Sequence, residues 1–289
     1  MTFRNGDGTL HAVCVGPEDG PLVILLHGFP EFWVGWQKQI APLAEAGFRV
    51  IVPDQRGYNQ SSKPAGVAQY GIAHLVSDVI AIADQTGSPT FFLAGHDWGA
   101  AVAWSVAIQH PDRISALAIL NVPHPAVMQS FLKGNPGQML RSWYIGFFQL
   151  PWLPEALISA FGFAAGKRAL TGSSLPGTFS PEDLSQYVEA WSQPGALTAM
   201  INWYRAALTT LRKPAVFRRP RLTLPVLILW GEKDKFLRVE MAHASLGYCE
   251  HAKLRTFPQN THWLQHERPE EVSQLLIEFF QKPDSTTTH

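Results

Sequence analysis

The sequence from Thr90 to Ala101 is Thr-Phe-Phe-Leu-Ala-Gly-His-Asp-Trp-Gly-Ala-Ala, an apolar run that leads into a glycine-flanked aspartate. The first five residues are apolar or β-branched and predict a strand buried on both faces, and the alanine-rich residues after Gly99 predict a helix. Gly95 and Gly99 flank Asp97 at the spacing of a nucleophile elbow, where small residues let strand and helix approach closely. The segment therefore predicts a strained strand-to-helix turn with Asp97 at its apex.

Asp97 is a carboxylate at the position where such an elbow usually carries serine. A carboxylate that attacks carbon by displacement becomes an alkyl ester, so the predicted chemistry is opening or displacement at an sp³ carbon. The alternative is that Asp97 is only a helix N-cap, because aspartate is a favoured capping residue. Other members of a site are needed to separate these two interpretations.

The composition favours a small partner. The chain has 289 residues, enough for one large α/β domain with an insertion. Its 23 basic and 23 acidic residues balance, which removes any general electrostatic argument for nucleic acid or for an anionic membrane surface as a partner. We therefore expect a small neutral or apolar substrate.

Cysteine usage and the N-terminal sequence predict a cytoplasmic location. Cys14 and Cys249 are the only cysteines, and neither a disulfide framework nor a metal or cofactor site is expected from their spacing. The first residues lack the apolar segment of a signal peptide, and no later apolar run has the length of a transmembrane helix. We expect a soluble cytoplasmic protein without membrane insertion, either a monomer or a homodimer.

Strand and helix patterns alternate through the first 120 residues and resume near the C-terminus. A turn at 5–8 joins two short edge strands. The expected strands after that turn are 10–15, 22–26, 48–52, 90–94, 114–121, 224–230 and 252–257, and the expected core helices are 36–46, 72–86, 100–108, 239–246 and 269–281. This alternation predicts an α/β protein with a mostly parallel, doubly wound sheet.

Residues 123–223 break the alternation. Helical patterns at 138–149, 154–161, 181–192 and 196–211 are separated by proline and glycine, with no convincing strand. We predict a core domain of residues 1–122 and 224–281, an all-helical lid at 123–223 and a flexible tail at 282–289. The apolar stretch 143–153 is interpreted as the lid face over a hydrophobic pocket rather than as a membrane contact.

His262 and Asp234 follow the last two expected strands and complete a catalytic set with Asp97. An ester intermediate needs a base that activates water, and the base needs an acid that orients it. The order Asp97, Asp234, His262 is the nucleophile, acid, histidine order of the α/β-hydrolase arrangement. Glu232 and Glu240 lie close enough in sequence to be alternatives to Asp234.

Two backbone amides are candidates for an oxyanion hole. The N–H groups of Phe29, in the loop His27-Gly28-Phe29-Pro30, and of Trp98, directly after Asp97, are the natural donors to the oxygen of a tetrahedral intermediate. The side chains of Phe29, Pro30, Trp98 and Trp263 are predicted to line the substrate pocket. Asp54 and Arg56 are expected to form a structural ion pair or turn contact nearby.

Four motifs together are similar to those of a known enzyme family. They are His27-Gly28-Phe29-Pro30, Gly95-His96-Asp97-Trp98-Gly99-Ala100, Asn121-Val122-Pro123-His124-Pro125 and His262-Trp263. With them the chain resembles the epoxide hydrolases of the α/β-hydrolase fold over nearly all of its length. Ser142-Trp143-Tyr144 and Asn202-Trp203-Tyr204-Arg205 resemble the two lid tyrosine motifs of that family, which implies catalytic roles for Tyr144 and Tyr204.

The resemblance implies hydrolysis of an epoxide to a vicinal diol through an ester on Asp97. Opening a neutral epoxide leaves an alkoxide, which needs a proton or a strong hydrogen bond, and two phenol hydroxyls can supply it. His262, oriented by Asp234, then activates the water that hydrolyses the ester. No metal or cofactor is implied, and neither the particular epoxide nor the regioselectivity follows from the sequence.

Two other functions remain open: haloalkane dehalogenation and non-catalytic ligand binding. Haloalkane dehalogenases share the Asp-Trp elbow but commonly place a halide donor, often asparagine, where this loop has Phe29. Haloacetate dehalogenases tend to carry arginine after the nucleophile, where this chain has Trp98, which disfavours an anionic substrate. A non-catalytic ligand-binding protein of the same fold would keep the pocket without needing Asp97, Asp234 and His262 together.

Overall fold

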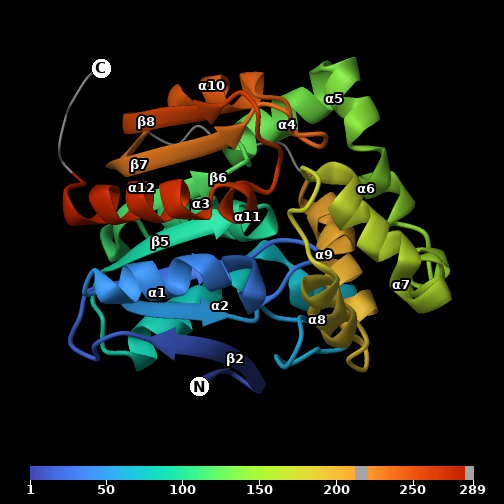
Figure 1. The fold of residues 1–289 in the computed structure, drawn as a ribbon, viewed down its shortest axis with the longest axis horizontal. Helices are drawn as coiled ribbons and strands as arrows, with labels where there is room; N and C mark the ends of the chain where they lie inside the picture. The colour runs from blue at the N-terminus through green and yellow to red at the C-terminus, as the bar shows by residue number, and fades with distance from the viewer. Residues whose placement is uncertain (212–220, 284–289) are drawn as a thin grey trace.

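The computed structural model describes residues 1–211 and 221–283, and an eight-stranded sheet forms the centre of this part of the chain (Figure 1). The strands are β1 (Thr2–Asn5), β2 (Gly8–Val15), β3 (Leu22–Leu26), β4 (Arg49–Pro53), β5 (Phe91–His96), β6 (Ile114–Leu120), β7 (Leu222–Gly231) and β8 (Cys249–Phe257). Their spatial order is β1-β2-β4-β3-β5-β6-β7-β8. The pairs β1·β2 and β2·β4 are antiparallel and the other pairs are parallel, which confirms the mostly parallel sheet.

Helices cover both faces of the sheet, as expected for a doubly wound fold. Successive side chains of a strand point to opposite faces, so each strand contributes to two apolar layers. On one face β3 packs with α2 (Ile72–Gln85) and α3 (Trp98–Gln109), and on the other face with α1 (Gln37–Glu45) and α12 (Pro269–Gln281). The remaining elements of the core are α10 (Glu240–Leu246), α11 (Leu264–Glu267) and the short 3-10 helices η1 (Trp33–Trp36), η2 (Val67–Tyr70) and η3 (Pro111–Arg113).

Between β6 and β7, helices are the only regular secondary structure in the described residues. They are α4 (Pro125–Gly134), α5 (Pro136–Arg141), α6 (Trp143–Phe147), α7 (Leu153–Ser173), α8 (Pro181–Trp191) and α9 (Ala196–Leu211). In Figure 1, α5 to α9 lie together at one side of the molecule, away from the bodies of α1 and α12. Part of the predicted lid, 212–220, and the end of the predicted tail, 284–289, lie outside the described residues.

Some helix bounds in this region differ from those expected. The helix predicted at 138–149 is interrupted at Ser142, whose backbone is non-helical, and becomes α5 and α6. The helix predicted at 154–161 extends as α7 to Ser173 across non-helical residues 160–163. The prediction missed α4, which begins with proline at its first position, where the missing N–H costs nothing because that donor would have no helical partner.

Side-chain hydrogen bonds join these helices to the loops of the core. Trp191 Nε1 on α8 donates to the carbonyl of Pro30 at 2.6 Å, and Trp203 Nε1 on α9 donates to the carbonyl of Arg56 at 2.9 Å. On α7, Ser173 Oγ accepts a 2.9 Å bond from Trp263 Nε1. The helices after β6 are therefore held over loops that follow β3, β4 and β8.

The expected contact between Asp54 and Arg56 is wrong. Arg56 pairs instead with Asp78 on α2, through bonds of 2.8 and 2.6 Å from its Nε and terminal nitrogen to the two carboxylate oxygens. This two-bond geometry matches the planar guanidinium fork, which a neighbour two residues away does not offer here. Asp54 lies 2.7 Å from His11 Nδ1 and accepts a 2.9 Å bond from Asn59.

Cys14 and Cys249 are both free thiols. Within residues 1–211 and 221–283, no helix combines the length and apolar character needed to cross a membrane. In the same residues, no group of three or more His, Cys, Asp or Glu side chains is arranged to hold a metal ion.

Candidate active site

Asp97 occupies a sharp turn between β5 and α3. Its backbone has φ of +49° and ψ of −123°, a conformation that side-chain-bearing residues rarely adopt outside strained functional turns. The turn requires Gly99, because a Cβ at that position would lie 2.1 Å from the carbonyl oxygen of Leu26. The predicted nucleophile elbow is thus present in the backbone.

The Asp97 side chain does not cap the helix. Its carboxylate makes no capping bond to α3, and Oδ1 instead accepts a 2.7 Å hydrogen bond from the N–H of Phe29. The loop after β3 can approach this closely because residue 28 is glycine, whose Cβ would otherwise lie 2.3 Å from Asp97 Cβ. The N-cap interpretation is therefore excluded as the explanation of this aspartate.

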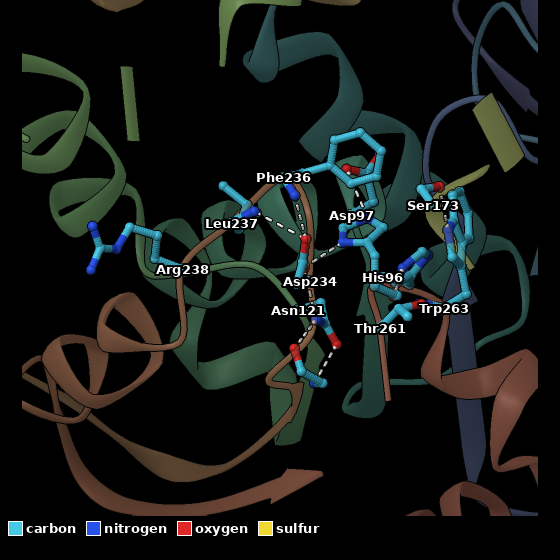
Figure 2. Close-up of polar contacts among 12 residues, drawn as sticks. His96, Asp97, Asn121, Ser173, Asp234, Phe236, Leu237, Arg238, Thr261 and Trp263 are labelled. Carbon is cyan, nitrogen blue, oxygen red and sulfur yellow. Dashed lines mark hydrogen bonds and ion pairs between the residues drawn. The ribbon is translucent and has the colours of Figure 1, made fainter. Parts of the chain in front are cut away.

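His262 connects the two aspartates. Its Nε2 lies 3.5 Å from Asp97 Oδ2, and its Nδ1 lies 2.7 Å from Asp234 Oδ2. His262 and Asp234 are each 2% exposed, whereas the Asp97 side chain is 19% exposed, so the carboxylate of Asp97 is the one open to a ligand. In Figure 2, Asp234 lies on a loop, and its side chain points toward the side on which Asp97 lies.

Asp234 is fixed by several donors in addition to His262. Its Oδ1 accepts from the N–H groups of Phe236 and Leu237 at 2.7 and 3.0 Å, and its Oδ2 accepts from Asn121 Nδ2 at 2.8 Å (Figure 2). The alternative acids do not reach His262: Glu240 binds Arg238, and Glu232 is exposed. Among the acids considered, Asp234 alone contacts the imidazole.

Asn121 is a site residue to which the sequence assigned no role. It directly follows β6, its φ is +54°, and its Oδ1 accepts a 3.2 Å bond from the Gly231 N–H while Nδ2 holds Asp234. Asparagine tolerates the left-handed region better than most residues. An asparagine directly after a buried parallel strand was the available signal, since its side chain falls at the carboxyl edge of the sheet.

Opposite charges in the site shift the pKa of both His262 and Asp97. Burial alone would lower the pKa of His262, but the carboxylates of Asp234 and Asp97 outweigh it and raise this pKa to about 10. Burial would raise the pKa of Asp97, but the hydrogen bond and charge of His262 outweigh it and lower this pKa below its usual value. At neutral pH the site therefore holds an imidazolium between two carboxylates.

Tyr144 on α6 and Tyr204 on α9 face each other beside Asp97. Their rings are 5.9 Å apart, and the Tyr204 ring lies 5.0 Å from Trp98 and 5.2 Å from Phe29 in edge-to-face contacts. Burial raises the pKa of both phenols well above the usual value, and the Asp97 charge raises each further. Both therefore keep their protons at neutral pH and can donate them.

Two apolar cavities meet at Asp97, Tyr144 and Tyr204. The larger, of about 570 Å³, is also lined by Phe29, Pro30, His262 and Trp263. The smaller, of about 230 Å³, lies on the other side and is lined by Trp98, Met128 and Leu237 among others. Of the four residues predicted to line the substrate pocket, Trp98 lines the smaller cavity and Phe29, Pro30 and Trp263 line the larger.

The Trp98 amide makes no hydrogen bond to the Asp97 carboxylate in the described residues, in contrast to the Phe29 amide. Its part in holding an oxyanion stays a prediction. His96, the neighbour of Asp97, donates through Nε2 to the carbonyl of His262 at 2.8 Å, and its Nδ1 lies 3.1 Å from the buried Glu31. His96 is thus a hydrogen-bonded support of the site.

Comparison with known proteins gives a consistent result. Residues 21–269 match the model of the alpha/beta hydrolase fold family. The chain is 46% identical over 279 residues to the AB hydrolase superfamily protein YfhM of Bacillus subtilis, covering 96% of each chain. It is 37% identical to epoxide hydrolase 4 of Mus musculus, covering 94% of this chain and 76% of that protein, and 31% identical to epoxide hydrolase A of Mycobacterium tuberculosis, covering 93% of both.

Solved structures agree with the sequence relatives. An epoxide hydrolase from Bacillus megaterium, solved in complex with an inhibitor, superposes with a TM-score of 0.88 at 29% identity, covering 98% of this chain and all of that one. An epoxide hydrolase from hot-environment metagenomes superposes with a TM-score of 0.86 at 33% identity, covering 97% of each chain.

Proposed function

This chain belongs to the α/β-hydrolase-fold family and is an epoxide-hydrolase-like enzyme, and on that premise we propose that it hydrolyses epoxides to vicinal diols through an ester on Asp97. One observation carries the proposal: two protonated tyrosines, Tyr144 and Tyr204, meet the ionised Asp97 at the junction of two apolar cavities. A nucleophile and two proton donors on one small volume suit the opening of a strained, neutral ether.

The first proposed step is alkylation of Asp97. Oδ2 attacks an epoxide carbon while Oδ1 remains on the Phe29 N–H, so the attacking oxygen is the one that lies near His262. The carbon–oxygen bond of the epoxide breaks, and its electron pair moves to the epoxide oxygen, which takes a proton from Tyr144 or Tyr204. The products of this step are a hydroxyalkyl ester and one tyrosinate.

The charge change on Asp97 then prepares His262 to act as a base. The ester is neutral, so one of the two carboxylates that raised the pKa of His262 is gone and this pKa falls. The imidazolium can now release its proton, which restores the tyrosine phenol. Neutral His262 remains hydrogen-bonded through Nδ1 to Asp234.

The second proposed step is hydrolysis of the ester. His262 Nε2 takes a proton from water, the hydroxide adds to the ester carbonyl, and the oxyanion forms on Oδ1 against the amides of Phe29 and Trp98. The tetrahedral intermediate then collapses, and the bond between Cγ and Oδ2 breaks. The leaving alkoxide, which carries Oδ2, takes the proton of the new carboxyl group. The diol departs, and the Asp97 carboxylate and the His262 imidazolium are regenerated. The net reaction converts one epoxide and one water molecule into one diol.

We propose that residues 1–122 and 224–281 act as the core domain and that 123–223 act as a lid that supplies the tyrosines and part of the cavity walls. A small neutral or apolar epoxide fits cavities lined mainly by apolar side chains.

Haloalkane dehalogenation is the second candidate, because Asp97 attacks carbon in both reactions. Halide departure needs no proton, so that reaction has no use for two phenol side chains that line both cavities together with Asp97. A non-catalytic receptor has no use for an imidazole placed 3.5 Å from the Asp97 carboxylate. Both observations favour the epoxide.

A side-by-side assay of a terminal aryl epoxide, a haloalkane and an aryl ester tests the proposal. We expect diol from the epoxide at a rate that far exceeds halide release or ester cleavage. Halide release that survives replacement of both tyrosines by phenylalanine would establish the dehalogenase instead. Saturable binding of the epoxide without turnover of any of the three compounds would establish the receptor.

A further inference from the structure

The large apolar side chains that are exposed to solvent are concentrated in one part of the chain. Apart from Met1 and Val15, all exposed large apolar residues of the described chain lie between 139 and 161. Six of them define what we call the outer patch: Leu140, Trp143, Leu150, Trp152, Leu157 and Phe161. Trp143, Trp152 and Phe161 are 65, 72 and 93% exposed, which is unusual for large aromatic side chains in a chain with its own core.

The outer patch belongs to three consecutive helices and their connections. These are α5, α6 and α7, which follow one another along the side of the molecule away from α1 and α12 (Figure 1). The interpretation of 143–153 as purely a pocket-covering face is therefore only half right. Tyr144, Phe147 and Phe148 line the larger cavity, but Leu150 and Trp152 point to solvent.

The charged residues that neighbour the outer patch in the sequence are mostly positive. Between residues 133 and 168 the cations are Lys133, Arg141, Lys167 and Arg168, and the single anion is Glu155. Glu155 is already paired with Arg205 at 2.7 Å. The Arg141 guanidinium donates to the carbonyl of Asp234 at 2.9 Å and interacts with the charge of Glu240, whereas among the described residues Lys133, Lys167 and Arg168 form no ion pair with a carboxylate. The chain as a whole is balanced, so this excess of positive charge is local.

The outer patch is continuous with the mouth of the larger cavity. Leu140, Arg141 and Trp143 are exposed and also line the cavity that reaches Asp97. An apolar molecule that arrives at the patch is therefore already at the entrance to the site.

We propose that the outer patch docks this protein on the surface of an anionic lipid membrane. The exposed aromatic and aliphatic side chains enter the boundary between headgroups and acyl chains, and the neighbouring cations face the lipid phosphates. This is attachment to one leaflet, in keeping with the described helices, none of which could cross a membrane. A second copy of the chain is disfavoured as the occupant, because a two-fold contact through this face would oppose like charges.

The docked orientation relates membrane attachment to the access of substrate to the active site. Resting on the proposed function, it places the mouth of the larger cavity against the bilayer, where a poorly water-soluble epoxide would be concentrated. The substrate class that the patch favours is therefore an apolar epoxide that partitions into lipid.

Co-sedimentation of the full chain with vesicles tests the proposal. The probes are vesicles of phosphatidylcholine alone and of phosphatidylcholine with phosphatidylglycerol. The test variant is Trp152→Asn/Leu157→Gln/Phe161→Asn, which removes three apolar groups that do not line either cavity; asparagine suits Trp152 and Phe161 because both have positive φ. The control is Val15→Gln, an exposed apolar residue on β2, and circular dichroism checks that each variant is folded.

We expect the wild type and Val15→Gln to bind the anionic vesicles at least tenfold more tightly than the neutral ones, and the triple variant to lose at least tenfold of that binding. Lys167→Gln/Arg168→Gln should weaken it as well, while Arg255→Gln on β8 should not. Equal binding of the wild type to both vesicle types, or of the triple variant and the wild type to anionic vesicles, overturns the proposal. So does a wild-type dimer that the triple variant abolishes, since the patch would then join two copies.

Hydrolysis of a water-soluble terminal epoxide, measured without vesicles, separates this proposal from the proposed function. The triple variant should keep wild-type activity in that assay. If the wild type binds anionic vesicles but cleaves no epoxide, the proposed function fails and the docking surface stands. If it cleaves epoxide but ignores vesicles, the docking surface fails alone.

Discussion

The N–H of Phe29 donates a 2.7 Å hydrogen bond to Asp97 Oδ1, so the loop after β3 already holds one oxygen of the carboxylate. The other oxygen, Oδ2, lies 3.5 Å from His262 Nε2, and the Asp97 side chain lines both cavities. The two oxygens of one side chain thus have different surroundings. Under the proposed mechanism they have different fates: Oδ2 is transferred to the product, and Oδ1 becomes the carbonyl oxygen of the ester.

Replacing His262 by glutamine should trap the ester. Glutamine cannot take a proton from water, so alkylation of Asp97 proceeds and hydrolysis does not. Intact-protein mass spectrometry after addition of a terminal aryl epoxide should show an enzyme heavier by one substrate. Asp97→Asn/His262→Gln should show no adduct, and His243→Gln, which changes an exposed residue of α10, should turn over normally. An unmodified His262→Gln protein would remove the histidine from the role of water-activating base.

The lid tyrosines should matter for epoxides and not for halides. Because an alkoxide needs a proton donor as it leaves, Tyr144→Phe and Tyr204→Phe should each reduce kcat for the epoxide about 10²-fold or more, and the double variant should have a larger defect. Tyr248→Phe is the matched control, since that ring stacks on His124 outside both cavities. Undiminished diol formation by the double variant would show that neither phenol is the acid.

Asn121 should act on ester hydrolysis through Asp234. Asn121→Gly removes a 2.8 Å bond to the Asp234 carboxylate but keeps the positive φ available, so the ester should hydrolyse about 10- to 100-fold more slowly. Asn59→Gly is a close control, because Asn59 also has positive φ and donates to an aspartate, Asp54, outside the catalytic set. Rapid-quench kinetics should show an unchanged rate of alkylation in both variants. If Asn121→Gly slows alkylation and ester hydrolysis equally, or if Asn59→Gly slows ester hydrolysis as much as Asn121→Gly does, the effect is a general loss of packing.

The raised pKa of His262 gives a pH-dependent stability. This pKa is about 10 in the folded chain and 6.5 in the unfolded one, so the stabilising contribution is complete below about pH 6.5 and is lost as pH rises through about 10. The free energy of unfolding of the wild type, measured with urea, should therefore fall between pH 7 and pH 10. The free energy of unfolding of His262→Gln should fall less steeply over the same range.

The same pKa can be read directly by NMR of the His262 ring. Asp97→Asn removes one of the two charges that raise it, so the titration of the ring should move to lower pH by about one unit or more. A His262 ring that titrates near pH 6.5 in the wild type, or whose titration does not move in Asp97→Asn, would contradict the proposed mechanism. That mechanism requires His262 to be an imidazolium in the resting enzyme.

The core could be predicted because its signals are local. The run around Asp97 has strand residues, a glycine pair and a helix former in immediate succession, and β5 and α3 differ from the expected bounds by only one or two residues at each end. The mostly parallel sheet follows from the alternation of strands and helices. The order Asp97, Asp234, His262 then follows from the carboxyl ends of parallel strands, which lie at one edge of the sheet.

The features that were missed depend on contacts distant in sequence. Asn121 and Asp234 are brought together by the adjacent strands β6 and β7, and nothing local to Asn121 names its partner. Arg56 binds Asp78 rather than Asp54 because α2 packs against the loop after β4. In the helical region, proline marks both breaks and helix starts, so composition alone did not place α4.

The origin of the oxygen in the first diol tests the central claim most directly. In a single turnover in H₂¹⁸O with enzyme in excess, the new oxygen of the diol comes from Asp97 Oδ2, so the diol should be unlabelled and ¹⁸O should appear in the peptide that contains Asp97. Diol that carries ¹⁸O in that first turnover, with no label in the peptide, would show that water attacks the epoxide directly and would contradict the ester on Asp97.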